Sequence, residues 1–186
     1  MLWNKHIDQI TSKGNKRLGF IKRNLKIPNK ALKEKAYKSL IRPTVEYAST
    51  VWDPASLQAS TQIEMIQRRS ARWVLGNYNP QASVTAMLTD LKWRTLALRR
   101  VDARLCMFYK IIHGLVKLPP SNYFRLQRDG IHVHPMTVKP EYYQFSFFPR
   151  TANDWCTLDT NVIKATSLNM FRNQISQINH PLPYLA

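Results

Sequence analysis

Apolar and small residues recur at intervals of three and four along the start of the chain. The recurring set is Trp3, Ile7, Ile10, Gly14, Leu18, Ile21 and Leu25. Residues at this spacing share one face of an α-helix, so the pattern predicts an amphipathic helix over residues 3–25. The opposite face carries Lys5, Ser12, Lys16 and Arg23, with Lys13 and Phe20 at its edge.

A second helix is expected to begin at Pro28 and Asn29. Its inward residues are expected to be Leu32, Ala36 and Leu40, and its outward residues Lys30, Lys33 and Lys38. Proline lacks the amide proton and clashes with the preceding turn, so Pro43 predicts a kink or a break near Arg42. The apolar residues Tyr47, Ala48, Val51 and Trp52 that follow are expected to be core, with Asp53 and Pro54 ending the segment.

Three further helices are expected before residue 119. The first covers about 60–75, stops at Gly76, and is expected to bury Ile63, Ile66, Ser70, Trp73 and Val74. A short helix follows over 83–91. A long helix capped by Thr95 then runs to His113, with an inward seam of Leu98, Val101, Leu105, Phe108 and Ile112 and with Arg99, Arg100 and Lys110 facing elsewhere.

The pattern changes after the dipeptide Pro119-Pro120. Residues 132–134 and 142–148 are rich in β-branched and aromatic side chains, which favours a short β-hairpin or extended segments near 131–148. Helical spacing then returns and predicts a C-terminal helix over 167–178. The expected fold is therefore mainly α. The expected regions are 1–55, a basic helical region; 56–118, further helices; and 119–186, a mixed region with short strands and a final helix.

Positive charge dominates the composition. The 186 residues include 28 lysines and arginines against 11 carboxylates, a formal net charge of +17. Twelve of these cations lie in residues 1–42, where Asp8 and Glu34 are the only acids. Such a field attracts polyanions, so nucleic acid is the expected partner.

Several strings, taken in order, resemble one polymerase family. They are Tyr37–Pro43, Glu46–Ser49, Val51–Pro54, Ile63–Arg72, Leu91–Trp93, Met107–Leu115, Tyr142–Tyr143, Ser146–Thr151 and Trp155. In this order they resemble the region after the catalytic palm in reverse transcriptases of LINE-type, non-long-terminal-repeat retrotransposons, jockey-like elements included. The string Cys156-Thr157-Leu158 departs from the family, which more often has Asn-Asn/Ser-Leu after the tryptophan.

The resemblance implies an RNA-directed DNA polymerase whose palm lies before Met1. Such polymerases hold Mg²⁺ with paired palm carboxylates, and this chain has no Asp-Asp pair, so no activity is expected from the chain alone and no cofactor within it. The resemblance further implies that the region up to about Trp52 is the thumb, which grips the template-primer hybrid, and that the rest is post-thumb.

The binding residues expected for RNA, DNA or their hybrid are basic. They are Lys5, Lys13, Lys16, Arg17, Lys22, Arg23, Lys30, Lys33, Lys38, Arg68 and Arg72. Contact with backbone phosphates requires positive charge and does not depend on the identity of the bases. For each cation a solvated surface position remains open, and Glu64, four residues before Arg68, offers that arginine an internal partner.

Other chemistry is poorly supported by the sequence. The spacing of Cys106, Cys156, His113, His132, His134 and His180 fits no compact zinc pattern. A nuclease site at Glu46, Asp53 and Glu64 would require these scattered acids to converge on a metal ion. Two cysteines and no long apolar run predict an intracellular protein, in the nucleus or a cytoplasmic ribonucleoprotein, with no membrane partner.

The leading hypothesis is a palm-less C-terminal fragment of a retrotransposon reverse transcriptase that retains thumb-type, non-specific RNA and DNA binding. The missing polymerase domains are a possible further partner. The alternative is a stand-alone nucleic-acid-binding or protein-interaction module derived from such an element.

Overall fold

The computed structural model describes residues 3–26, 28–139 and 141–180. Over these ranges the chain is mainly helical and no strand is formed, which confirms the mainly α prediction. It forms two compact units, Leu2–Leu98 and Arg99–Pro181, which divide within helix α7. The boundaries expected at 55 and 118 fall inside these units, and the three-region division stays a prediction.

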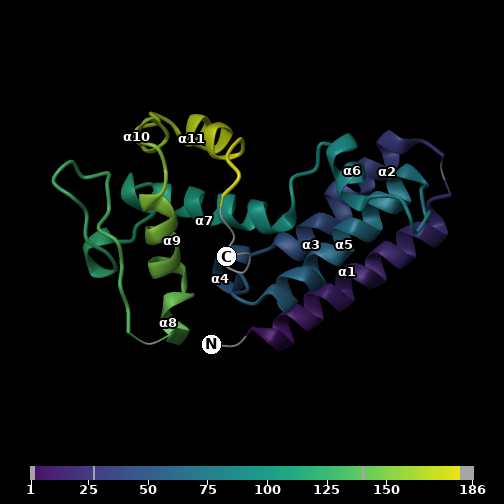
Figure 1. The fold of residues 1–186 in the computed structure, drawn as a ribbon, viewed down its shortest axis with the longest axis horizontal. Coiled ribbons are helices and arrows are strands. Elements are labelled where there is room, and N and C mark those ends of the chain that lie inside the picture. The colour runs from purple at the N-terminus through teal and green to yellow at the C-terminus, as the bar shows by residue number, and fades with distance from the viewer. Residues whose placement is uncertain (1–2, 27, 140, 181–186) are drawn as a thin grey trace. The chain divides into compact units, whose positions relative to one another are not determined.

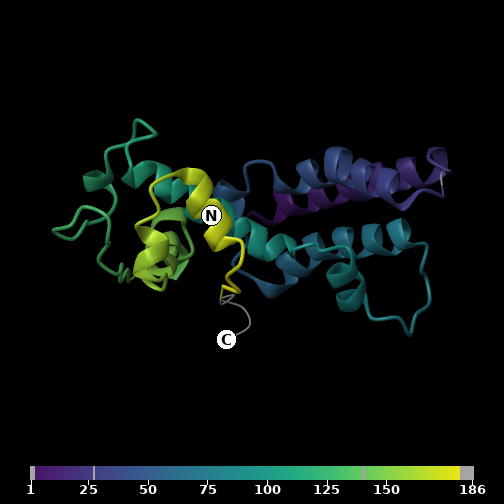
Figure 2. The same cartoon turned by 90° about the horizontal axis from the view of Figure 1, so that it is seen from above.

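The unit Leu2–Leu98 is a helical bundle (Figure 1). Its elements are α1 (Asn4–Asn24), α2 (Lys30–Ala36), the π-helical turn η1 (Tyr37–Ile41), α3 (Arg42–Glu46), α4 (Ser49–Trp52), α5 (Leu57–Leu75), α6 (Val84–Asp90) and the start of α7 (Leu96–Ile112). Helix α1 packs against α5, α3 and η1, and Figure 2 shows the same helices from above.

The predicted inner face of α1 is the buried one. Ile7, Leu18 and Ile21 are buried at the positions that the spacing predicts. Gly14 lies where α1 crosses α5 and α3 most closely, because a Cβ atom added there would lie 2.9 Å from Ile66 Cδ1 and 3.2 Å from Val45 Cγ1. With one side of α1 buried in this way, its basic side is left facing solvent.

The second helix buries a different face from the one predicted. Leu32 and Leu40 are exposed, and Tyr37 and Ile41 are buried instead. The Tyr37 ring stacks on Trp93, a residue distant in sequence, with centroids 4.1 Å apart. This contact selects the face one residue later along the helix and corrects the prediction.

Pro43 produces a π-helical turn rather than a break. The amide of Arg42 donates to the carbonyl of Tyr37, five residues back, and the helix then continues as α3. A wider turn before a proline accommodates a ring that cannot donate to the preceding turn.

The segment after α3 was expected to be core, and only part of it is. Trp52 is buried and its indole donates to the Tyr47 carbonyl at 2.8 Å, but the side chains of Tyr47 and Val51 are 81% and 62% exposed. Ala48 between them adopts a left-handed conformation with φ 52°, which turns the chain from α3 into α4.

The next three helices lie close to the predicted ranges, although α5 begins at Leu57, earlier than the predicted start at about residue 60. Ser56 and Ser83 cap α5 and α6 through their side-chain oxygens, and Gly76 ends α5 in the left-handed conformation with φ 66°. The hydroxyl of Thr95 accepts from Leu98 N at the start of α7. The five residues predicted to be buried on α5 are all buried.

The unit Arg99–Pro181 has its own core. Its elements are the remainder of α7, the 3₁₀ turn η2 (Pro120–Asn122), α8 (Glu141–Gln144), α9 (Phe147–Cys156), α10 (Thr160–Ile163) and α11 (Leu168–Ile175). Phe108, Trp155 and Phe171 are fully buried, and Trp155 contacts both phenylalanine rings. Helix α11 confirms the predicted C-terminal helix.

The strand expected over 142–148 is wrong. These residues lie in α8, in the turn at 145–146 and at the start of α9, where Pro149 fits because the first turn of a helix leaves amides without internal partners. Aromatic contacts override β-propensity here, since Phe147 and Phe148 pack against Phe108 and Tyr123. Residues 131–134 come closer to the expectation, with one antiparallel bridge between Leu126 and Val133.

Arg100 was expected to face outward and is instead 1% exposed. Arg104, one turn further along α7, is buried too and forms a 2.8 Å ion pair with Asp154 of α9. A buried guanidinium requires such partners, so this cluster fixes α9 against α7.

Candidate nucleic-acid interface

A row of cations runs along the exposed side of α1. Lys5, Lys16 and Arg23 are separated by 11 and 7 residues, close to three and two helical turns, so they line up along the axis. At about 1.5 Å per residue the row spans roughly 27 Å, the length of about eight base pairs. Lys13 lies beside it, and these four residues are called the basic row below.

Phe20 lies within the basic row. Its side chain is 62% exposed, one turn from both Lys16 and Arg23. Among the residues that the structure describes, no ion pair or hydrogen bond engages a side-chain nitrogen of Lys5, Lys13, Lys16 or Arg23. The row therefore presents unpaired charge together with an exposed ring.

Arg17 closes one flank of the row. It donates to the Leu40 carbonyl at 3.1 Å and to the hydroxyl of Thr44. These bonds fix Arg17 against η1 and α3.

Helix α5 and the loop after it form the other flank. Arg69 of α5 donates to Asn15 Oδ1 at 2.9 Å, and the ammonium of Lys22 lies 5.4 Å from the centre of the Tyr78 ring. Partial burial, and then the nearby charge of Arg69, lower the pKa of Lys22. The sequence did not single out Arg69 or Tyr78, because their roles depend on residues of α1 more than 50 positions away.

The three predicted lysines of α2 and η1 have partners within the protein. Lys30 pairs with Asp90 at 2.9 Å, Lys38 pairs with Glu34 at 2.5 Å, and Lys33 lies 5.9 Å from the centre of the Trp73 ring. The hydrogen bond from Lys38, and then the one from Trp93, lower the pKa of the Glu34 carboxyl. These lysines remain candidates, but a phosphate would compete with existing contacts.

The two arginines of α5 that were predicted to bind nucleic acid differ in whether they have a partner within the protein. Arg72 donates to the Asn79 carbonyl at 2.9 Å, which supports the loop after α5. Arg68 is exposed and, in the described part of the chain, has no ion-pair or hydrogen-bond partner. Glu64 instead accepts from Ala97 N at 2.6 Å, at the first turn of α7.

The residues considered for metal or nuclease chemistry are not brought together. Within residues 3–26, 28–139 and 141–180, no three His, Cys, Asp or Glu side chains are close enough to hold a metal ion. Glu46 pairs with Arg42 at 3.5 Å. Cys106 and Cys156 are free thiols, and burial raises the pKa of each. In the same ranges no helix combines the length and apolar character needed to cross a bilayer.

Comparisons with known proteins give no relative to place beside this geometry. No family model matches the chain, and no curated protein or solved structure matches it.

Proposed function

We propose that the unit Leu2–Leu98 binds nucleic acid through its phosphate backbone, using the basic row of α1. The unpaired charge of that row carries the proposal, since an ordinary exposed helix pairs many of its cations with acids three or four residues away. On α1 only Asp8 is acidic. Arg17, Lys22 and Arg68 extend the positive surface to either side.

The chemistry of the row suits backbone binding rather than base reading. Lysine ammonium groups are point charges that can bind a phosphate from many directions. Non-specific binding is supplied almost entirely by such contacts. Phe20 adds a ring face that stacks on any unpaired base. The substrate class that follows is RNA, DNA or their hybrid without strong sequence preference.

The order of strings along the sequence, which resembles that of a polymerase family, supports a more specific setting for this activity. We infer that the chain is the thumb and post-thumb part of an RNA-directed DNA polymerase of the LINE type. In that setting the row grips the template-primer hybrid, and Mg²⁺ belongs to a palm outside this chain. We propose no catalytic activity for the chain by itself. The proposed cellular location is intracellular, in the nucleus or a cytoplasmic ribonucleoprotein.

One observation favours the alternative, a stand-alone binding or protein-interaction module. Leu40, Tyr47 and Val51 are large apolar side chains that are more than half exposed. Exposed apolar side chains of this size are common at protein contacts, so they suit a protein partner, whether the polymerase domains or another chain.

A salt series on the purified chain tests the proposal. Binding to an RNA–DNA hybrid, duplex DNA and unrelated RNA is measured by fluorescence anisotropy. For duplex DNA the affinity is expected to fall with a log–log slope of about −0.9 per phosphate contacted. Reversing Lys13, Lys16 and Arg23 to glutamate is expected to flatten that slope by about 3 units.

The matched control reverses Lys117, Arg128 and Lys164, which are exposed cations of the other unit. Both triple variants change the net charge equally, so a site on α1 predicts that only the first loses affinity. Equal losses would show a general effect of net charge, and no binding at low salt would exclude the proposed function.

A further inference from the structure

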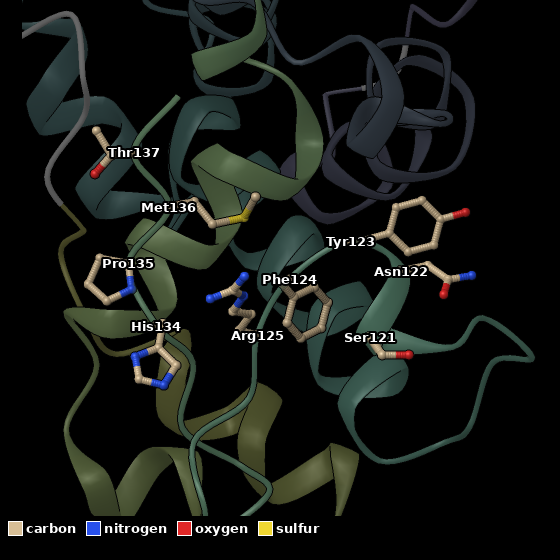
Figure 3. A pocket seen from close by; sticks show the side chains of 9 residues that line it. All are labelled: Ser121, Asn122, Tyr123, Phe124, Arg125, His134, Pro135, Met136 and Thr137. Carbon is tan, nitrogen blue, oxygen red and sulfur yellow. The ribbon is translucent and has the colours of Figure 1, made fainter. Parts of the chain in front are cut away.

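The unit Arg99–Pro181 contains a hollow of about 560 Å³ (Figure 3). Two segments line it, 121–125 on one side and 134–137 on the other. Its volume lies within the range of about 300–1,000 Å³ that is usual for small-molecule sites. Among the described residues that line it none is acidic, and Arg125 and His134 are the ionisable nitrogen-bearing side chains of that set.

The antiparallel contact between the two segments directs Arg125 and His134 into the hollow. His134 N donates to the Arg125 carbonyl at 3.0 Å, next to the bridge between Leu126 and Val133. Val133 is buried, and successive side chains of extended backbone point to opposite faces. Arg125 and His134 therefore emerge together on the other face. Figure 3 shows the guanidinium between the imidazole and the Phe124 ring.

Aromatic side chains support the opposite wall. Phe124 is buried, with its ring centre 4.6 Å from that of Phe108. Tyr123 stacks on Phe148 at 4.3 Å with an interplanar angle of 12°, and 38% of its surface remains exposed. The wall thus offers an anchored ring beside the two nitrogen-bearing side chains.

Helix α9 holds the second segment in place. Met136 N donates to Asn153 Oδ1 at 2.9 Å, and Asn153 Nδ2 donates back to the Met136 carbonyl at 3.2 Å. This two-way bond fixes the backbone after His134. Both walls are therefore formed before a ligand arrives, which lowers the entropy cost of binding.

We propose that this hollow binds one nucleotide of a single-stranded nucleic acid. Arg125 donates its paired N–H groups to the phosphate, His134 adds a further donor, and the base lies against the exposed ring of Tyr123. Arginine suits phosphate because its planar fork donates two parallel hydrogen bonds. A base can lie here because stacking on an aromatic side chain requires only an open ring face. The site goes beyond the backbone binding proposed for the basic row, since it takes a single unstacked nucleotide.

The test uses mononucleotides and the full chain. Adenosine 5′-monophosphate, adenosine and inorganic phosphate are titrated against the labelled protein, with binding followed by NMR. The monophosphate is expected to bind at least about ten-fold more tightly than either part alone, because phosphate and base are both recognised. The shifted resonances are expected to belong to residues 121–125 and 134–137.

Two variants with matched controls separate the roles. Arg125→Gln is expected to weaken binding of the monophosphate about ten-fold or more. The control Arg128→Gln changes an exposed position of the same loop that does not line the hollow, and it is expected to leave that affinity unchanged. Tyr123→Leu is expected to weaken the monophosphate but not inorganic phosphate. Circular dichroism checks that each variant is folded.

Three results would overturn the inference. Inorganic phosphate or a phosphoserine peptide binding as tightly as the monophosphate would show that the base is not recognised. An unchanged affinity in folded Arg125→Gln would exclude the phosphate contact. Loss of mononucleotide binding in the Lys13, Lys16 and Arg23 triple variant would place the ligand on the basic row, so the two proposals fail separately.

Discussion

At the scale of single residues, Asp129 shows how strongly a local turn can bias a carboxyl group. Its oxygens accept from the backbone amides of Ile131 and His132 at 3.2 and 3.0 Å, and from the His132 imidazole. The side-chain bond to His132 is the main reason that the pKa of Asp129 is lowered from 3.8 to about 2. The ionised form therefore organises the turn that joins Leu126 to Val133.

The pKa of Asp129 gives a direct prediction. Because the folded-state pKa is depressed, the contribution of this carboxylate is present above its ordinary pKa and is lost as the pH falls from 3.8 through about 2. His132→Ala is expected to raise the pKa towards the ordinary value. A carboxyl ¹³C titration measures it, with His134→Ala as the control, and equal midpoints in the two variants would contradict the assignment.

At the scale of elements, the crossing of α1 over α5 depends on Gly14. Glycine in a helix costs up to about 1 kcal/mol relative to alanine, so its presence requires a packing reason. The neighbouring atoms of Ile66 and Val45 provide that reason, since both residues are fully buried and have little room to move.

Gly14→Ala and Gly19→Ala are therefore expected to have opposite effects. At Gly14 an overpacking cost of about 1–3 kcal/mol exceeds the gain in helix propensity, so a net loss of about 1 kcal/mol is expected. At Gly19 the nearest atom is the Arg23 side chain at 3.4 Å, so alanine is expected to stabilise by about 0.5–1 kcal/mol. Urea unfolding measures both, and a stabilised Gly14→Ala would refute the close crossing.

The elements also show which features a sequence can specify. Helix ends were predictable where the signal is local, as with Ser83, Thr95 and Gly76. The buried face of α2 and the helical state of 142–148 were not, because each depends on aromatic contacts between residues far apart in sequence. The sequence pattern carries no information about which distant ring will be available.

At the scale of the whole molecule, the net charge of +17 acts on folding as well as on partners. Like charges repel most at low ionic strength, so the compact state is destabilised there. Raising salt from about 20 mM to about 200 mM is expected to raise Tm, because the Debye length shortens to below about 10 Å.

Calorimetry in chloride salts measures this shift. The triple variant at Lys13, Lys16 and Arg23 is expected to show a smaller rise, because it begins with less repulsion. A Tm that is unchanged or lower in salt would mean that ion pairs, such as those of Lys30 and Lys38, outweigh repulsion.

Only part of the candidate site could be predicted without the three-dimensional fold. Composition and spacing predicted a basic face on α1, and the spacing of residues 5, 16 and 23 was sufficient for that. The partner of Lys30 was not predictable, because Asp90 is 60 positions away, whereas Lys38 and Glu34 have the spacing of neighbours on one helix. The hollow at Arg125 was not predicted from the sequence, because its two walls are formed by separate segments of the chain.

The lowered pKa of Lys22 has a consequence for covalent chemistry. An amine reacts with an acylating reagent only in its uncharged form, and Lys22 holds more of that form near neutral pH than a lysine with an ordinary pKa. Lys22 lies at the edge of the basic row, and it is therefore expected to be acylated faster than an equally exposed lysine with an ordinary pKa. Acylation there would remove one positive charge from the flank of the row and leave Lys5, Lys13 and Lys16 in place.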